Sequence, residues 1–267
     1  MKINHDFSAP SDSQTPFIHP ERPASRFRPL KALHHFRELI KNKEDTEQVF
    51  HIFEALPRPG FRKDAKKFVD SEQGKRLLAS EPELAVILDD HERLRQMPEG
   101  SLAHAYCDFM EKEGLSAAGL IAEYDQFSPR KYGDLIEWYG FRQRDTHDLL
   151  HVLTGYGRDA LGEACVLAFT YGQNPALGNL FISYAAGLNM KKQVKSQAPI
   201  FKAIREAQKM GKACPRINEE SVIDLLAQPL DALRERLKIH TPHFYHQAHA
   251  QFRAQNVDPY DMLAQAA

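Results

Sequence analysis

The 267-residue chain has few cysteines and almost no net charge. Its three cysteines, Cys107, Cys165 and Cys214, are far apart in sequence and form no Cys-x-x-Cys pair. This pattern argues against a disulfide framework and against a cysteine-ligated zinc site, and it fits reduced thiols in the cytoplasm. The formal net charge of −1 gives no general attraction to nucleic acid, so we expect no nucleic-acid partner.

The motifs of several common enzyme classes are also missing. The chain has no Gly-x-x-x-x-Gly-Lys for phosphates, no Gly-x-Gly-x-x-Gly for dinucleotides and no Gly-x-Ser-x-Gly of serine hydrolases. It lacks the His-Glu-x-x-His of zinc proteases and the Glu-x-x-His of two-iron bundles. Strand-like alternation is missing too, whereas apolar residues recur at helical spacing. We therefore predict an all-α fold, a multi-helix bundle.

The chain divides into an arm and a domain. Residues 1–29 are rich in serine, proline and arginine, which predicts an extended or disordered arm, and residues 1–7 show no signal peptide. Residues 30–267 are long enough for a single helical domain, although about the first 95 residues could form a separate helical unit. Within the domain, we expect one helix over residues 64–78 and another over residues 144–153.

The longest stretch without a formal charge covers residues 164–190. Its 27 residues could cross a membrane, but Gln173-Asn174-Pro175 interrupts the stretch. We therefore predict two buried helices, Cys165–Tyr171 and Ala176–Met190, joined by a turn.

Four potential metal ligands lie close together in the sequence: His147, Asp148, His151 and Glu163. Two imidazoles and two carboxylates can bind a divalent metal and leave coordination positions open. The first three would share one side of a helix, within an arc of about 100°. A straight helix would carry Glu163 ~18 Å away from His151, so the chain must turn before Glu163 can join.

Glycines supply that turn. Gly155 and Gly157 can end the first helix, a second helix over residues 158–171 can run back beside it, and Gly162 permits close approach. A His-x-x-x-His pair alone is usually an ordinary surface or core pair, but the carboxylates and the glycine break favour a metal. The sequence thus predicts a metal-binding helical hairpin.

Other charged and histidine residues allow more than one interpretation. Arg144 precedes Asp148 by four residues, so it could orient that carboxylate, receive a substrate carboxylate or simply be exposed. A hydrolase of the His-Asp type, with His104 and Asp224 as remote ligands, would leave His151 and Glu163 without roles.

Four histidines recur at every third position, where a helix drifts by about 60° per step and no carboxylate is near, so we expect solvated or ring-packed side chains. They are His240, His243, His246 and His249.

The four candidate ligands resemble the His-Asp-x-x-His, eleven residues, Glu signature of the Coq4 family of ubiquinone-biosynthesis proteins. The resemblance is clearest over residues 80–245. Supporting stretches are Pro98–Leu102, Leu161–Glu163 and Leu233–Leu237, with Pro242 nearby.

The resemblance implies a single divalent metal, zinc, and an apolar tunnel for an isoprenoid chain; the ligand set would also permit iron. The resemblance implies either of two functions. The first is a metal-dependent, lyase-type enzyme that oxidatively decarboxylates a polyprenylated 4-hydroxybenzoate and so hydroxylates its carbon 1. The second is a non-catalytic, isoprenoid-binding scaffold. The resemblance also implies other quinone-biosynthesis proteins as partners and peripheral attachment to a membrane surface, on the inner face of the bacterial inner membrane or the matrix side in mitochondria. We further expect a homo-oligomer.

Roles for individual residues follow from combining the resemblance with the spacing. Asp148 is expected to bind the metal or, with only three ligands present, to orient a ligand or act as a base. Arg144 is the second candidate catalytic residue. The charge-free stretch after Glu163 is expected to line the lipid tunnel, with four candidate residues. They are Leu167, Phe169, Phe181 and Tyr184.

Overall fold

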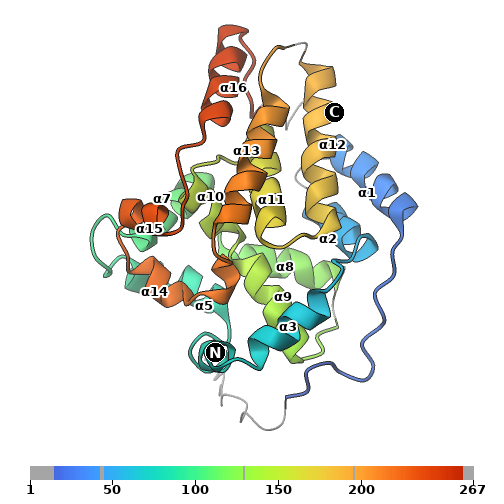
Figure 1. The fold of residues 1–267 in the computed structure, drawn as a ribbon, viewed down its shortest axis with the longest axis vertical. Helices are drawn as coiled ribbons and strands as arrows, with labels where there is room; N and C mark the ends of the chain where they lie inside the picture. Colours follow the sequence, from blue (N-terminus) through green and yellow to red (C-terminus); the bar gives the residue numbers. More distant parts are fainter. Residues whose placement is uncertain (1–14, 43–44, 129, 195, 261–267) are drawn as a thin grey trace, which may run out of the picture.

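The computed structural model describes residues 15–42, 45–128, 130–194 and 196–260, which form an all-α protein (Figure 1). In these residues no β-strand occurs, only an isolated bridge between Ser101 and Pro229. The helices of the first half are α1 (Pro29–Lys41), α2 (Thr46–Ala55), α3 (Phe61–Val69), α4 (Glu72–Ser80), α5 (Leu84–Asp89), α6 (His91–Leu94), α7 (Leu102–Glu113) and α8 (Ala117–Phe127).

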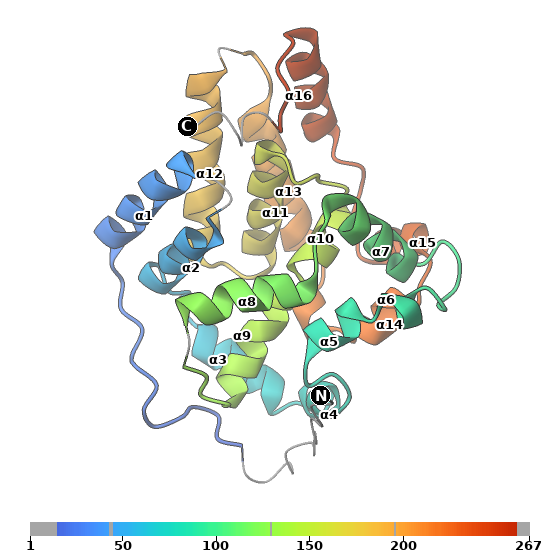
Figure 2. The same ribbon diagram turned by 180° about the vertical axis from the view of Figure 1, so that it is seen from behind.

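The second half supplies the centre of the molecule. Its helices are α9 (Leu135–Asp145), α10 (His147–Thr154), α11 (Ala160–Gln173), α12 (Leu177–Gln193), α13 (Ile200–Ala213), the 3-10 helix η1 (Ile217–Glu219), α14 (Val222–Leu226), α15 (Leu230–Arg236) and α16 (His243–Ala254). Helices α11, α12 and α13 stand side by side, and α1 and α2 flank α12 (Figure 1). Seen from behind, α8 runs across the molecule from below α2 toward α10 (Figure 2).

Polar caps decide where several helices begin. Ser101 accepts a hydrogen bond from the His104 amide at the start of α7, and Asp134 accepts one from the Glu137 amide at the start of α9. Ser71 does the same for Gly74 and so starts α4. The prediction of one helix over residues 64–78 is therefore wrong, because this cap divides the segment into α3 and α4.

The charge-free stretch forms two helices, α11 and α12, each longer than predicted and joined by a turn at residues 174–176. In the described residues, no helix combines the length and the apolar character that crossing a membrane requires. Residues 16–22 of the arm lie against the start of α9, and Arg28 at its end bonds to α2. The carbonyls of Pro16 and Phe17 accept hydrogen bonds from the first amides of α9, and Arg22 forms a forked ion pair with Asp134. Residues 1–14 of the arm lie outside the described residues.

Candidate metal site and cavity

The two arms of the hairpin are α10 and α11. Helix α10 begins at His147, and Gly155 ends it in the left-handed region, with φ of 75°, where a side chain would strain the backbone. Asp159 then caps α11 by accepting hydrogen bonds from two amides of its first turn. Glu163 consequently lies on the first turn of α11 and faces the histidines of α10.

Three of the candidate ligands converge. The Nε2 atom of His147 lies 3.6 Å from Oε2 of Glu163, and Nε2 of His151 lies 3.5 Å from Oε1. One donor atom from each of the three residues lies within 4.8 Å of the others. Around a tetrahedral zinc ion, donor atoms ~2.0–2.1 Å from the metal are about 3.3 Å apart, by geometry. The spacing therefore fits one metal ion with an open fourth position better than it fits short hydrogen bonds.

The surroundings of His151 leave its Nε2 atom free to act as a metal ligand. Its Nδ1 lies 3.0 Å from the carbonyl oxygen of Tyr156, which can only accept a hydrogen bond, so Nδ1 carries a proton. In the neutral ring, Nε2 then holds the free lone pair and points toward Glu163. The ring is buried and stacks on Phe109 of α7 with centroids 5.6 Å apart. This is the arrangement that fixes a metal-binding imidazole.

The charges of the three residues are coupled. Burial alone would lower the pKa of His151, but the Glu163 carboxylate outweighs it and raises this pKa above its usual value. Burial would likewise raise the pKa of Glu163, yet His151 and His147 hold it well below its usual range. Glu163 is therefore ionised at neutral pH, and a metal entering the site would compete with a proton for Nε2 of His151.

A cavity of about 600 Å³ opens beside the three residues. His147, Asp148, Arg158 and Glu163 line its polar end. Much of the remaining wall is apolar and comes from α1, α2, α8, α11 and α12, with Phe36, Leu39, Ile40, Val49, Leu120, Leu167, Ile182, Ala186 and Met190 among its members. Five further polar residues also line the cavity: Thr46, Glu113, Ser116, Glu123 and Asn189. Its size and its combination of apolar and polar lining are typical of a small-molecule site.

The sequence profile of one family, described as coenzyme Q (ubiquinone) biosynthesis protein Coq4, matches residues 34–243, well over half of the chain. The chain belongs to the Coq4 family. The match also covers residues 34–41 of α1 and all of α2, which lie outside residues 80–245, where the sequence resemblance was clearest.

Curated relatives of this Coq4-family protein are described as mitochondrial ubiquinone biosynthesis proteins. The Bos taurus homologue is 29% identical over 172 residues, which cover 64% of this chain and 62% of the relative. The Lachancea thermotolerans protein is 28% identical over 207 residues, covering 74% and 59%. The chain thus matches about three fifths of each relative. A crystal structure of a Nostoc punctiforme protein, proposed to act in ubiquinone biosynthesis, shares the fold with a TM-score of 0.56 at 19% identity, covering 81% of this chain and all of that one.

Asp148 and Arg144 lie differently from the other predicted site residues. Asp148 is outside the converging group and instead lines the cavity next to it. Arg144 pairs with Asp145 at 2.7 Å and lies over the ring of Phe141, so of the three roles considered for it, the ion pair with Asp148 is not the one that the structure has. The cation at the polar end of the cavity is Arg158, which sequence analysis missed.

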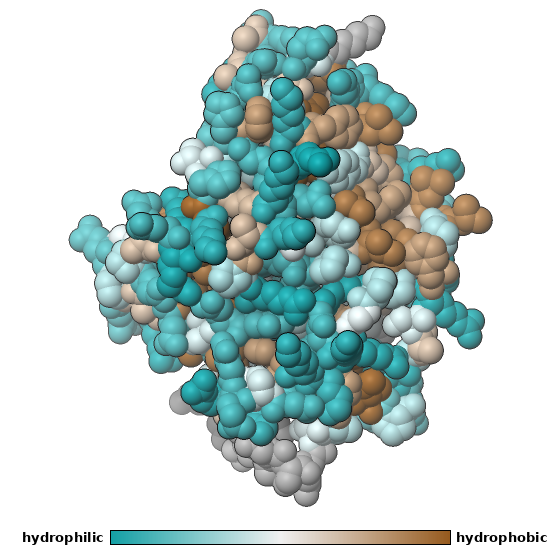
Figure 3. Space-filling view, viewed as in Figure 1, coloured by the Kyte–Doolittle hydropathy of each residue, from teal (hydrophilic) through white to brown (hydrophobic). Residues whose placement is uncertain are grey.

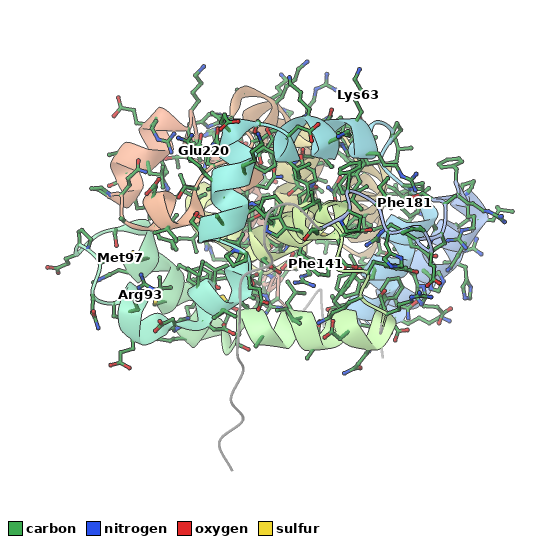
Figure 4. All side chains as sticks on the ribbon, turned by 90° about the horizontal axis from the view of Figure 1, so that it is seen from below. Lys63, Arg93, Met97, Phe141, Phe181 and Glu220 are labelled. Carbon is green, nitrogen blue, oxygen red and sulfur yellow. The ribbon has the colours of Figure 1, made fainter. Side chains whose placement is uncertain are left out.

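The four candidate tunnel residues lie in different surroundings. Leu167 lines the cavity, whereas Phe169 is fully buried in the main core. Phe181 points toward α1 (Figure 4) and meets Phe36 edge to face, with centroids 5.3 Å apart. The Tyr184 hydroxyl donates a hydrogen bond to Gln208 of α13. Of the remote hydrolase ligands, His104 bonds to the carbonyls of residues 95 and 97, and Asp224 lies outside the converging group.

Proposed function

We propose that this Coq4-family protein acts in ubiquinone biosynthesis as a metal-dependent enzyme. It would carry out oxidative decarboxylation, replacing the carboxylate at carbon 1 of a polyprenylated 4-hydroxybenzoate by a hydroxyl. The observation that carries the proposal is the adjacency of a three-residue metal donor set and a largely apolar cavity of about 600 Å³. Burying an isoprenoid chain stabilises the complex by about 0.8 kcal/mol per methylene, and the polar end would receive the aromatic ring.

The donor set suits one divalent metal, most simply zinc, with iron as the alternative. His147, His151 and Glu163 would hold the ion, and a bound ion would polarise substrate oxygen atoms as a Lewis acid. Asp148, on the cavity wall beside this set, can hold or move a proton of the substrate or of water. Arg158 can pair with the substrate carboxylate before that group leaves as carbon dioxide.

The overall reaction releases carbon dioxide and removes two electrons from the ring as the hydroxyl replaces the carboxylate. With water as the source of the hydroxyl oxygen, the carboxylate and one water molecule give the phenol, carbon dioxide, one proton and two electrons. An assay must therefore contain a two-electron acceptor, such as dioxygen, which is reduced to hydrogen peroxide. The chain's own contribution is to bind the lipid tail, orient the ring and keep bulk water away from it.

We also propose that the protein binds a membrane surface, where its lipid substrate would reside. An apolar patch covers part of α12 and α1 (Figure 3). Its exposed large side chains include Leu30 and Leu33 on α1 and Leu188 on α12. Other faces of the same two helices line the cavity, so the patch adjoins the lipid site. A second copy or another quinone-biosynthesis protein could cover the same patch. The location would be the cytoplasmic face of a bacterial inner membrane, or the matrix side in a mitochondrion.

A strain that lacks the protein provides the test. We expect it to accumulate a polyprenylated 4-hydroxybenzoate and to lose ubiquinone, as measured by mass spectrometry of lipid extracts. Wild-type protein should restore ubiquinone. Glu163→Ala should lose both bound metal and ubiquinone, whereas Asp148→Asn should retain metal, measured by elemental analysis of the purified protein, and lose ubiquinone.

Two results would contradict the proposal. Unchanged quinone intermediates in the deletion strain would remove the protein from the pathway. Full restoration of ubiquinone by both Asp148→Asn and Glu163→Ala would favour the scaffold, because binding a lipid or a partner does not require the proton-handling carboxylate or the metal.

A further inference from the structure

Helix α16, near the C-terminal end of the described chain, contacts the hairpin at the capping residue of α11. The hydroxyl of Tyr245 donates a hydrogen bond of 2.5 Å to Oδ2 of Asp159, and Nε2 of His249 donates one of 3.1 Å to Oδ1. Asp159 is fully buried, and burial together with this carboxylate raises the pKa of Tyr245, so its hydroxyl keeps the donated proton. A buried carboxylate with these two donors is held in a single orientation.

Both metal-binding arms depend on the segment that α16 holds. The Asp159 carbonyl accepts the backbone hydrogen bond of Glu163, 2.9 Å long, while its carboxylate caps the first turn of α11. The Tyr245 hydroxyl also accepts a hydrogen bond from the Gly157 amide at 3.0 Å. Next to it, the carbonyl of Tyr156 accepts the hydrogen bond from Nδ1 of His151. One segment, residues 156–159, therefore positions His151 on one side and Glu163 on the other.

Residues 156–159 are packed so closely against α11 and α16 that they have little room to move. A Cβ atom added at Gly162 would lie only 1.9 Å from the carbonyl oxygen of Gly157, so the segment lies directly on the first turn of α11. A Cβ added at Gly157 would lie 3.0 Å from the Tyr245 hydroxyl. Such close packing transmits a shift in α16 to the metal ligands rather than absorbing it.

We propose that Tyr245 and His249 are positioning residues, which act through Asp159 to hold Glu163 and His151 at metal-binding distance. The proposal rests on the metal site of the proposed function. The proposal also gives a role to His249, the last of the four histidines that recur at every third position. Groups that orient metal ligands typically contribute 10- to 100-fold to metal affinity.

The test uses full-length protein stripped of metal. Zn²⁺ affinity is measured by competition with a chromophoric chelator, and Co²⁺ is added because its visible absorption reports ligand geometry. We expect Tyr245→Phe and His249→Leu each to weaken Zn²⁺ binding about tenfold or more and to change the Co²⁺ spectrum. His249→Gln, which keeps an N–H donor near the Nε2 position, should recover most of the affinity. His243→Leu, at an exposed histidine of the same helix, is the matched control and should bind like wild type.

The outcomes separate this proposal from the proposed function. A wild-type protein that binds neither ion contradicts the metal site itself. Wild-type protein that binds metal, with Tyr245→Phe and His249→Leu unchanged in affinity and spectrum, overturns only the positioning role, even if both melt at lower temperature. If Tyr245→Phe fails to fold, the two His249 variants provide the test. The proposal is overturned if His249→Leu binds Zn²⁺ more weakly and His249→Gln does not recover the affinity.

Discussion

The two sides of α11 differ in how closely they are packed: the closed side faces α13, and the open side faces α1 and α12. Toward α13 the helices approach so closely that a Cβ at Gly211 would lie 2.0 Å from the Phe169 carbonyl oxygen, and one at Gly172 would lie 2.3 Å from that of Gln208. Toward α1 and α12, the same helix borders a cavity of about 600 Å³ through Glu163 and Leu167. A chain able to pack one side of a helix this tightly does not leave the other side open through poor packing. The side of α11 that faces α13 therefore contributes to stability, and the side that borders the cavity is where the proposed ligand would bind.

The largest expected difference concerns two residues that lie on opposite sides of α11. Phe169→Ala should lower the free energy of unfolding by about 4 kcal/mol, because it leaves a void in the main core. Leu167→Ala should cost only about 1 kcal/mol, because that side chain already borders open space. Urea unfolding measures both values. Losses that differ by less than about 1 kcal/mol would show that the open side is closed in solution.

A glycine pair tests the closed side more narrowly. Gly211→Ala should destabilise the protein by about 2–3 kcal/mol, because the new methyl group meets the α11 backbone rather than a flexible side chain. The same change at Gly140, inside α9, should stabilise it by about 0.5 kcal/mol, since the nearest atom to the new Cβ is 3.8 Å away and alanine favours the helix. Thermal unfolding of the two variants decides this. A neutral Gly211→Ala would mean that α13 can move away freely.

Local signals predicted the closed, all-α framework well. The spacing of apolar residues indicated helices throughout, and Gly155 and Gly162 indicated where the chain turns and where it approaches itself. The histidine and glutamate spacing required α11 to return toward α10. These features depend on residues close in sequence, where helical geometry and backbone sterics leave few alternatives.

The side of α11 that borders the cavity could be predicted only in part from the sequence, because, of the four candidate tunnel residues, only Leu167 lines the cavity. Its walls include α1, α2 and α8, which reach the cavity only through contacts between distant segments. The expected pairing of Arg144 with Asp148 assumed one helix over residues 144–153, but α9 ends at Asp145 and α10 begins at His147. Residues four apart lie on the same face only within one continuous helix, so this spacing predicts no contact across such a break. Spacing also could not show that the Asp148 carboxylate lies outside the donor group.

The smallest expected effect compares two arginines. Arg158→Gln should weaken binding of a prenylated 4-hydroxybenzoate about tenfold, because a charge-assisted hydrogen bond to its carboxylate contributes about 1.5 kcal/mol when partly exposed. Binding of the corresponding prenylated phenol, which has no carboxylate, should stay unchanged. Equilibrium titration of both ligands with the full-length protein, independent of turnover, measures the two affinities.

Arg144→Gln is the matched control for that comparison. Its guanidinium pairs with Asp145 and lies over the Tyr124 and Phe141 rings, so its loss should lower stability and leave the preference for the carboxylated ligand intact. The opposite result, with the preference lost in Arg144→Gln and kept in Arg158→Gln, would place the carboxylate on the other side of α10.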